Sequence, residues 1–424
     1  MDGWLPTALE ALAVVGVIVA VSRRSRRWTV RWIPILLVIG VIAAVTTRWY
    51  VGDLGIASEP APWRLWLWTG MSAATVTAVV AGWPETGWFR RNATVFAASQ
   101  CILSIGVITN VWIGYFPTVD TAWSQLTARP LPDETDWAAV QARHTQSGGG
   151  ALLPVDTGST ASGFSHRTEY VYLPPAWFTS SPPPRLPVVM MIGGEFNTPA
   201  DWVRAGNAVS ALDAYAATHS GHAPVAVFAD STGSFFNDTE CVNGPRGRAA
   251  DHLTKDVIPY VANHFGARAS NWGVAGFSAG GTCAVDLAVM HPELFRVFLD
   301  IAGDPGPNAG NRRQTIDRLY GGDEQAWLHF DPATSIARRG AYGDLAGQFV
   351  VPAATGTNAV DPCKSAPTST DDDVRAASAL CVLGRSKGID CTVVIQPGRH
   401  VWPFAATAFS EALPWLDAQL TERR

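Results

Sequence analysis

The residues with the clearest chemical meaning form a Gly-x-Ser-x-Gly pattern at positions 276–280, centred on Ser278. An apolar run at 272–275 precedes the pattern, and an Ala-rich helical segment at 282–291 follows it. On a sharp turn from a strand into a helix, the serine hydroxyl projects above the sheet edge, and the flanking glycines avoid clashes with neighbouring elements. The pattern therefore predicts that Ser278 is a nucleophile. Such short patterns also arise by chance in Gly-rich turns, but the flanking strand and helix favour the functional interpretation.

A serine hydroxyl is a weak nucleophile and needs a neighbouring base. In strand–turn–helix sites of this kind, the acid and then the histidine follow the serine along the chain. His400 has the right position, because it follows the last apolar run, at 392–395, and precedes the last helical segment, at 403–420. His291, which precedes a proline at a helix end, is typical of a capping or packing residue. We therefore expect His400 to be the base; the alternative is a loop histidine bonded to water.

The acid that orients the histidine is less sharply defined. We expect it in the loop after the apolar run at 349–354, where Asp361 is the first choice. Asp371, Asp372 and Asp373 form a second cluster, whose alternative role is to cap the following helix and offset its dipole. Both possibilities stay open on the sequence.

Acyl transfer also needs two backbone N–H donors about 3 Å from the oxygen that becomes negative in the transition state. Ala279, directly after the serine, supplies one of them at the start of its helix. The other is expected in the loop at 193–196, where the backbone N–H of Glu195 is the best candidate. The carboxylate of Glu195 has the alternative role of contacting substrate.

Short apolar runs alternate with longer amphipathic segments from residue 168 onwards. The expected strands are 168–173, 186–192, 225–229, 272–277, 297–302, 349–354 and 392–395. The expected helices are 200–218, 248–265, 279–291, 372–387 and 403–420. Strand-like runs joined by crossover helices are typical of an α/β fold, with a mostly parallel sheet covered by helices on both faces.

The first third of the chain is apolar and carries few charges. Four stretches approach the length of about 20 residues that crosses a bilayer as a helix: 5–21, 32–47, 65–83 and 93–113. Buried core helices are the alternative, but four such stretches in succession, separated by short loops, favour an all-α transmembrane region of four helices.

Arginines indicate how this region is oriented. Four of them, from Arg23 to Arg27, follow the first stretch, and Arg90 and Arg91 follow the third. The positive-inside tendency places these loops in the cytoplasm, so everything after residue 113 is expected outside it. We therefore expect a multi-pass cell-membrane protein, with a transmembrane region at 1–114, a linker at 115–165 and an extracytoplasmic domain at 166–424.

Charge and cysteine content restrict the possible functions and compartments. The net charge of −5 disfavours a nucleic-acid partner, because no basic face is present to displace counterions from phosphates. Cys101 lies in an apolar stretch and is expected to be a free thiol. The domain at 166–424, which is expected outside the cytoplasm, contains the remaining cysteines: Cys241, Cys283, Cys363, Cys381 and Cys391. Disulfides persist outside the cytoplasm. We expect a Cys241–Cys283 bridge and one bridge among the last three.

The outer domain resembles the esterase D family, which includes the mycolyltransferases of the antigen 85 group. The resemblance spans about residues 165–420 and rests on motifs in the same order: 190–194 with Asp201-Trp202 after it, 276–281, 291–295 and 398–402. It implies an α/β-hydrolase fold and a Ser/acid/His triad, with no metal or cofactor. The segment around Asp361 and the loop at 236–248 depart from the family's pattern.

These inferences predict a membrane-anchored serine esterase or acyltransferase that uses Ser278, His400 and Asp361 and forms an acyl-enzyme. Water as acceptor would make it an esterase, and a sugar or lipid hydroxyl would make it an acyltransferase. Tethering at a membrane favours a lipid or glycolipid ester of the cell envelope as substrate. The alternative is a non-catalytic envelope-binding or scaffold protein on the same fold.

Overall fold

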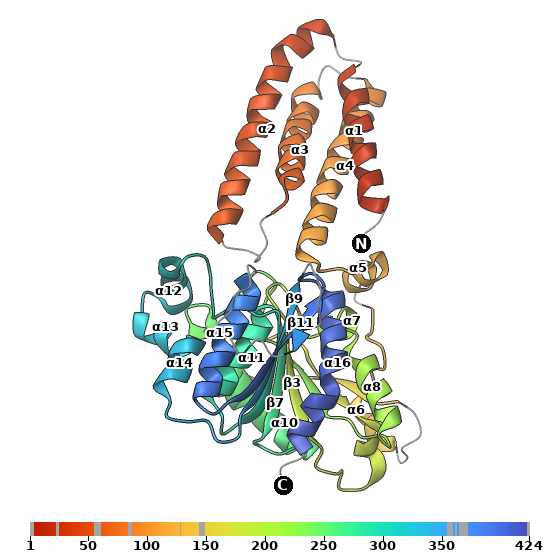
Figure 1. The fold of residues 1–424 in the computed structure, drawn as a ribbon. Coiled ribbons are helices and arrows are strands. Elements are labelled where there is room, and N and C mark those ends of the chain that lie inside the picture. Colours follow the sequence, from red (N-terminus) through yellow and green to blue (C-terminus); the bar gives the residue numbers. More distant parts are fainter. Residues whose placement is uncertain are drawn as a thin grey trace. The chain divides into compact units, whose positions relative to one another are not determined.

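The chain divides into two compact units, Met1–Trp123 and Ser124–Arg424. A computed structural model describes residues 4–22, 25–54, 61–83, 87–127, 129–143, 149–353, 359–360, 363 and 372–421. Figure 1 shows the helices of the first unit and the α/β arrangement of the second.

The first unit contains four long helices. They are α1 (Trp4–Ser22), α2 (Arg26–Leu54), α3 (Trp63–Gly82) and α4 (Trp88–Ile113), followed by the short helix α5 (Val119–Leu126). By length and composition, α2, α3 and α4 are able to cross a membrane. The apolar part of α1 is shorter, Trp4–Ala20. Among the described residues, three helices rather than the expected four therefore meet the criteria for a span.

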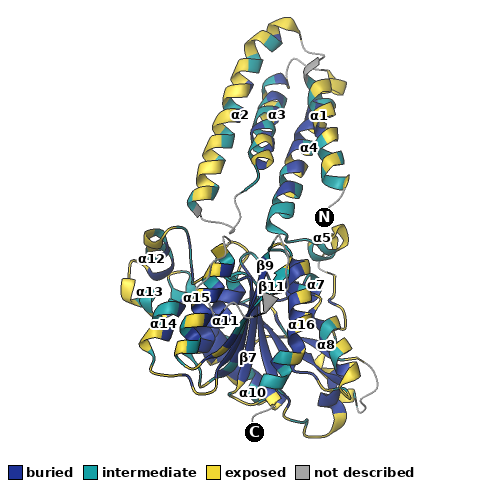
Figure 2. Cartoon of the chain, viewed as in Figure 1, coloured by how far each residue is buried: buried dark blue, intermediate teal, exposed yellow. Residues whose placement is uncertain are grey.

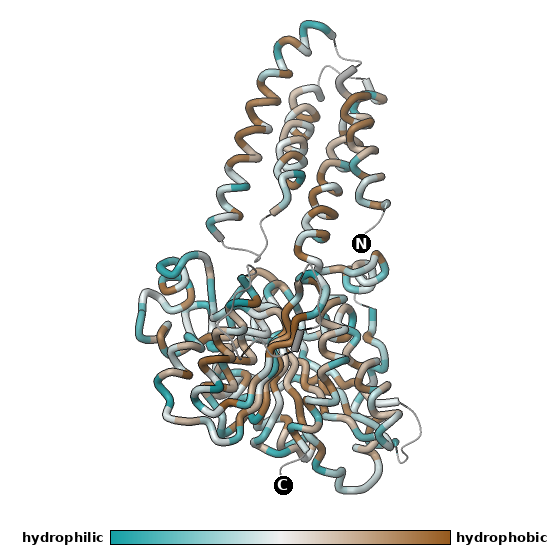
Figure 3. Tube along the Cα trace, in the orientation of Figure 1, coloured by the Kyte–Doolittle hydropathy of each residue, from teal (hydrophilic) through white to brown (hydrophobic). Residues whose placement is uncertain are grey.

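Small residues allow two of these helices to approach closely. A Cβ atom on Gly70 of α3 would lie 2.8 Å from the backbone oxygen of Gly40 of α2. Such close contacts are frequent between helices in membranes, where packing takes the place of a hydrophobic driving force. Leu37, Val41 and Val45 of α2 are 63%, 61% and 60% exposed, and the helix is largely hydrophobic in Figure 3. An exposed apolar surface of this kind is suited to contact with lipid.

The second unit is built on a nine-stranded sheet with the order β1-β2-β4-β3-β7-β8-β9-β11-β10. The six strands from β4 to β11 in this order are parallel, whereas β1, β2 and β10 pair antiparallel at the edges. Their bounds are β1 (Ala151–Val155), β2 (Glu169–Leu173), β3 (Val188–Ile192), β4 (Val225–Ala229), β7 (Trp272–Phe277), β8 (Phe295–Ile301), β9 (Ala346–Ala353), β10 (Ala359–Val360) and β11 (Asp390–Pro397). The mostly parallel sheet confirms the expected fold class.

Helices cover both faces of this sheet, and the strands between them are buried (Figure 2). One face packs against α7 (Asp201–Arg204), α8 (Ala208–Thr218) and α16 (Trp402–Thr421). The other packs against η2 (His252–Val257), α10 (Ile258–Phe265), α11 (Ala279–Met290), α14 (Pro332–Arg338) and α15 (Asp372–Ser386). The remaining elements are α6 (Trp137–Ala142), η1 (Pro175–Thr179), β5 (Asn243–Gly244), β6 (Gly247–Arg248), α9 (Ala249–Asp251), α12 (Arg312–Tyr320) and α13 (Glu324–Phe330).

The sheet begins earlier in the chain than the sequence indicates. Strand β1, which lies in the segment expected as a linker, pairs with β2 from Ala151 opposite Leu173 to Val155 opposite Glu169. The strand is short and contains Pro154, which cannot donate a hydrogen bond and is tolerated on an edge strand. These features hide it from a search for continuous β-branched runs.

Two disulfides tie loops of the second unit to its helices. Cys241 pairs with Cys283 of α11, and Cys363 pairs with Cys381 of α15. Both bridges confirm the expected pairing, and Cys101 and Cys391 are free and buried. Burial raises the pKa of Cys391 to about 12, so this thiol stays protonated and is slow to exchange with the neighbouring bridge.

The Cys241–Cys283 bridge should contribute more to stability than the other one. It spans 42 residues, against 18 for Cys363–Cys381, and the chain-entropy model gives about 4 and about 3 kcal/mol for loops of these lengths. We expect Cys241→Ala/Cys283→Ala to lower the urea midpoint of tryptophan fluorescence further than Cys363→Ala/Cys381→Ala does. Equal midpoints for the two double variants would contradict this ranking.

Candidate active site

Ser278 alone joins strand β7 to helix α11. Its backbone has φ 59° and ψ −130°, a conformation that is costly for a residue with a side chain. Its N–H donates to the carbonyl oxygen of Ile301 at the end of β8, at 2.9 Å. Its own carbonyl accepts from the N–H groups of Gly281 and Thr282, at 2.7 and 3.2 Å. The turn is therefore held from both sides.

The two glycines of the pattern are sterically required. A Cβ atom on Gly276 would lie 1.8 Å from the carbonyl oxygen of Gly280. A Cβ atom on Gly280 would lie 2.2 Å from the carbonyl oxygen of Ile192, the last residue of β3. Because backbone atoms occupy both positions, no side-chain rotation relieves either clash.

The loop after β3 lies directly against the serine. A Cβ atom on Gly194 would be 2.8 Å from the Cβ atom of Ser278. The N–H of Gly194 donates to Oδ1 of Asn197 at 2.9 Å, and the N–H of Asn197 returns a bond to the Gly194 carbonyl at 3.1 Å. Among the described residues, the N–H groups of Glu195 and Ala279 have no hydrogen-bond partner. Both remain available to an oxyanion.

An arginine that the sequence analysis missed anchors this loop. Arg167 donates through Nη2 to the carbonyl oxygen of Asn197 at 2.8 Å and to Oδ1 of Asp230 at 2.6 Å. Its Nε and its backbone N–H both donate to Oδ2 of Asp230, at 3.0 and 2.7 Å. Although burial alone would raise the pKa of Asp230, the Arg167 bonds and charge hold it below its ordinary value. In the sequence, an acidic residue directly after a buried strand, Asp230 after β4, could have indicated that a basic partner such as Arg167 is needed.

His400 lies beside the turn. Its ring centroid is 5.0 Å from that of Phe277, the residue before Ser278, and the ring of Trp402 contacts Phe277 at the same centroid distance. Burial lowers the pKa of His400 to about 4, so the ring is a neutral base near pH 7. Among the described residues, no hydrogen bond joins the side chains of Ser278 and His400.

The candidate acids fall into two groups. Asp361 and Asp371 lie outside the described residues. Asp372 and Asp373 begin α15, and Asp372 forms an ion pair with Arg375 one turn along the same helix. For Asp372 the structure therefore gives a role at the helix end.

The carboxyl group of Asp300 lies beside the serine turn. Asp300 is buried at the end of β8 and accepts a hydrogen bond from the N–H of Gly303 at 2.7 Å. A Cβ atom on Gly281 would lie 2.3 Å from its Oδ1, which places it against the first turn of α11. Burial raises the pKa of Asp300 to about 7.

Three loops carry further carboxyl groups. Glu195 follows β3, Asp238 and Glu240 lie between β4 and β5, and Asp304 follows β8. Burial, together with the charges of Asp238 and Asp304, raises the pKa of Glu195 to about 8, although Arg246 opposes the shift. Burial likewise raises the pKa of Glu240 well above its ordinary value. A protonated Glu195 can donate a hydrogen bond as well as accept one, a property that the sequence pattern did not predict.

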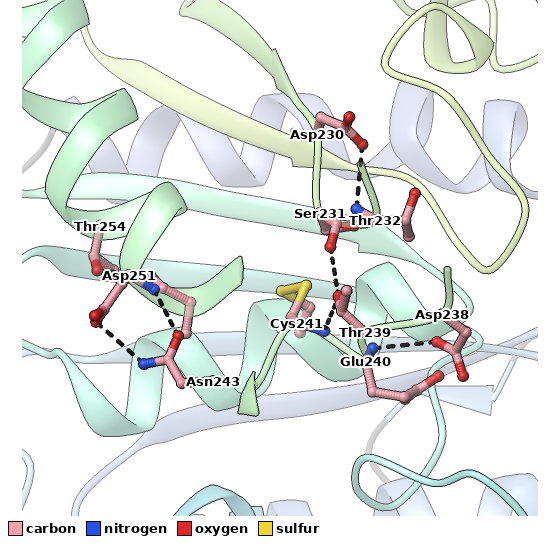
Figure 4. The surroundings of a disulfide bond; sticks show 12 residues. Asp230, Ser231, Thr232, Asp238, Thr239, Glu240, Cys241, Asn243, Asp251 and Thr254 are labelled. Carbon is pink, nitrogen blue, oxygen red and sulfur yellow. Dashed lines mark hydrogen bonds between the residues drawn. A yellow bond between two sulfur atoms is a disulfide. The ribbon is translucent and has the colours of Figure 1, made fainter. Parts of the chain in front are cut away.

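Figure 4 shows how the loop between β4 and β5 is held. Thr239 donates to the Ser231 carbonyl oxygen at 2.5 Å and accepts from the Cys241 N–H at 3.2 Å. The disulfide then joins Cys241 to Cys283 in the second turn of α11. The bridge therefore attaches the carboxyl-bearing loop to the helix that Ser278 precedes.

Three phenylalanines form an aromatic group on the adjoining loops. The Phe196 and Phe235 rings are 5.4 Å apart, and those of Phe235 and Phe236 are 5.0 Å apart. Phe235 is 44% and Phe236 87% exposed. Because Phe196 directly follows Glu195, this group provides an apolar surface next to the loop that contacts the serine.

Comparison with known proteins identifies relatives of this chain. The Esterase family model matches residues 164–341. An uncharacterized protein of Corynebacterium glutamicum is 30% identical over 427 residues, covering 96% of this chain and 92% of that protein.

Two solved structures resemble part of this chain. An S-formylglutathione hydrolase from Agrobacterium tumefaciens aligns with a TM-score of 0.50 and 18% identity, covering 64% of this chain and 96% of that one. MPT51 of Mycobacterium tuberculosis aligns with a TM-score of 0.40 and 17% identity, covering 60% of this chain and 94% of that one. The family match and the relative that spans nearly the whole chain agree with the sheet and the serine turn: this chain belongs to the esterase family, on an α/β-hydrolase fold.

Proposed function

We propose that this protein is a membrane-anchored serine esterase or acyltransferase that acts on acyl esters outside the cytoplasm. The observation that carries the proposal is the strained backbone of Ser278 between β7 and α11, with the Gly194 loop against it. Strain of this kind persists where the surroundings enforce it, and it is concentrated at functional sites.

The proposed reaction assigns one role to each of these groups. The Ser278 hydroxyl attacks the ester carbonyl carbon and passes its proton to neutral His400, while the carbonyl oxygen becomes negative. The N–H groups of Glu195 and Ala279 stabilise that oxygen, and α11 begins at Ala279, so its positive end faces the same charge. His400 returns the proton to the departing alcohol, which leaves an acyl group on Ser278.

The second half-reaction decides between the two activities. His400 removes a proton from an incoming hydroxyl, which attacks the acyl-enzyme and releases Ser278. Water as the incoming group gives an acid, and a sugar or lipid hydroxyl gives a new ester. The carboxyl groups of Glu195, Asp238 and Asp304 lie near one another beside this centre, where they can hydrogen-bond hydroxyl groups.

The location and substrate class of this proposal rest on three features. Among the described residues, three helices have the length and composition of membrane spans, and cysteines of the second unit form two disulfides, which are typical of oxidising compartments. The exposed Phe235 and Phe236 rings supply apolar surface for an acyl chain. We therefore propose a lipid or glycolipid ester of the cell envelope as substrate.

Replacement of Ser278 should remove both labelling and turnover. We expect full-length Ser278→Ala to resist a fluorophosphonate probe and to lose more than about 10⁴-fold in p-nitrophenyl ester hydrolysis, because no other group supplies the nucleophile. Ser234→Ala, at an exposed serine in a nearby loop, is the matched control and should label like wild type. Equal labelling of all three proteins would contradict the proposal, and a wild type that never labels would favour a scaffold protein.

The acid can be assigned from the pH profile. A carboxylate beside an imidazole stabilises its charged form and raises its pKa. Burial by itself lowers the pKa of His400 to about 4, and a carboxylate bonded to the ring would hold it above that value. We expect Asp361→Asn to lower kcat by about 10⁴-fold and to move the acidic limb of kcat/KM downward, towards pH 4. Asp372→Asn is the control; if it produces these effects and Asp361→Asn does not, the assignment is wrong.

Asn197 should act on the rate rather than on binding. Loss of its side chain leaves the Gly194 N–H without its acceptor, so the loop that presents Glu195 is held only through the bond from Arg167 to the backbone carbonyl of residue 197. We expect Asn197→Ala to lower kcat by about 10- to 100-fold, less than the loss of roughly 10²- to 10³-fold on removing an oxyanion donor, because the donor itself stays in place, with KM changed less than twofold. Asn263→Ala, at an exposed asparagine on α10, is the control. An unchanged kcat would show that the Asn197 bond does not position the loop.

A further inference from the structure

A second cluster of chemically active side chains lies outside the proposed triad. His166, Glu169 and His252 each offer one nitrogen or oxygen atom, and these atoms all lie within 4.8 Å of one another. Glu169 and His252 are fully buried, and the His166 side chain is 9% exposed. We propose that this cluster binds one divalent cation of the zinc class. The proposal is independent of the esterase mechanism.

Two separate segments bring these side chains together. Glu169 is the first residue of β2, and His166 precedes it by three residues. His252 opens η2, a π-helical stretch between α9 and α10. Because π-helical turns are rare and frequent at functional sites, the widened turn at His252 is a second observation that points to a built site.

Each histidine is oriented by its Nδ1 atom. Nδ1 of His252 lies 3.4 Å from Oδ2 of Asp256, and Nδ1 of His166 lies 2.8 Å from the carbonyl oxygen of Arg167. The carboxylate of Asp256 also accepts from two backbone N–H groups, those of Ala161 and Ser162. Histidines that ligate metals almost always donate their other ring N–H to a carboxylate or a backbone carbonyl in this way.

The Nε2 atom of each histidine faces a carboxylate oxygen. Nε2 of His252 lies 3.2 Å from Oε1 of Glu169, and Nε2 of His166 lies 3.4 Å from Oδ1 of Asp156. Two imidazole nitrogens with carboxylate oxygens form a donor set that suits Zn²⁺, whereas Mg²⁺ and Ca²⁺ prefer oxygen ligands alone. Asp156 is exposed and is available as a further ligand.

Two other features bear on this assignment. His166 faces Glu169 through Nδ1, at 3.8 Å from Oε2, and its ring is stacked on that of His252 with centroids 4.6 Å apart. A cation shared through Nε2 therefore requires His166, the less enclosed ring, to rotate towards Glu169. The carboxylate of Glu169 also accepts from Thr157 Oγ1 and the Asp230 N–H. A metal-free network, with His252 bridging Glu169 and Asp256, is therefore the competing interpretation.

A cation bound here would stabilise the loop beside Ser278 through a chain of intervening contacts. Glu169 binds the backbone of Asp230, Asp230 pairs with Arg167, and Arg167 holds the carbonyl of Asn197. The cation would thus fix the start of β2 together with this chain of contacts. We assign it a structural role, with no direct contact to the substrate.

The test is zinc binding by the full-length protein in detergent. After removal of metals with a chelator, Zn²⁺ is added in competition with a chromogenic chelator, and bound metal is counted by mass spectrometry. We expect one zinc per chain in wild type, a thermal midpoint that rises with Zn²⁺, and no comparable response to Mg²⁺. His166→Ala is the first variant, because the other two ligands are fully buried; it should lower zinc affinity by 100-fold or more.

Two further variants complete the test. Asp256→Asn should lower zinc affinity by about 10- to 100-fold, the range for groups that orient a ligand, and His264→Ala, at an exposed histidine on α10, should leave it unchanged. Absence of zinc binding by wild type, or equal binding by wild type and folded His166→Ala, would overturn the proposal and leave the metal-free network. Fluorophosphonate labelling of each variant reports folding of the serine site separately from metal binding.

Discussion

The site depends on one backbone constraint: the chain turns from β7 into α11 at a single residue, Ser278, with a positive φ. This turn is possible only because Gly276 and Gly280 leave room for each other's backbone and for the carbonyl end of β3. The same close packing brings Gly194 against the serine. Ser278, the N-terminus of α11 and the Gly194 loop are thus positioned by one steric requirement, and a methyl group added at Gly276 or Gly280 would displace all three.

A second constraint is the charge concentrated at the carboxyl ends of the parallel strands. Asp230 and Asp300 are buried at the ends of β4 and β8, and Asp304 follows β8 and is partly buried. Unpaired charges are costly in such surroundings. Arg167 compensates the first, so Asp230 stays ionised, whereas burial raises the pKa of the other two. The edge therefore combines a fixed ion pair, which orders the loop at Asn197, with carboxyl groups that can be protonated.

Local patterns account for what the sequence predicted correctly. The bounds of β4 and β7 match the expected ranges because both strands are buried, continuous apolar runs, and the turn at Ser278 has a glycine pattern with a steric cause. Contacts between distant segments leave no such pattern. Arg167 and Asp230 are 63 residues apart, and the raised pKa of Glu195 reflects burial together with carboxylates from two other loops. Asp361, outside the described residues, stays a prediction.

The cysteines and the arginines both indicate the compartment of the second unit, and they do so for independent physical reasons. Arginine asymmetry reflects how helices insert into a membrane, whereas a disulfide reflects the redox potential around a folded domain. The Cys241–Cys283 bridge attaches the loop that carries Asp238 and Glu240 to the second turn of α11. In a reducing cytoplasm this attachment would be lost, and the loop would be free to move away from Ser278. An extracytoplasmic location is therefore also the one in which the proposed active site keeps its shape.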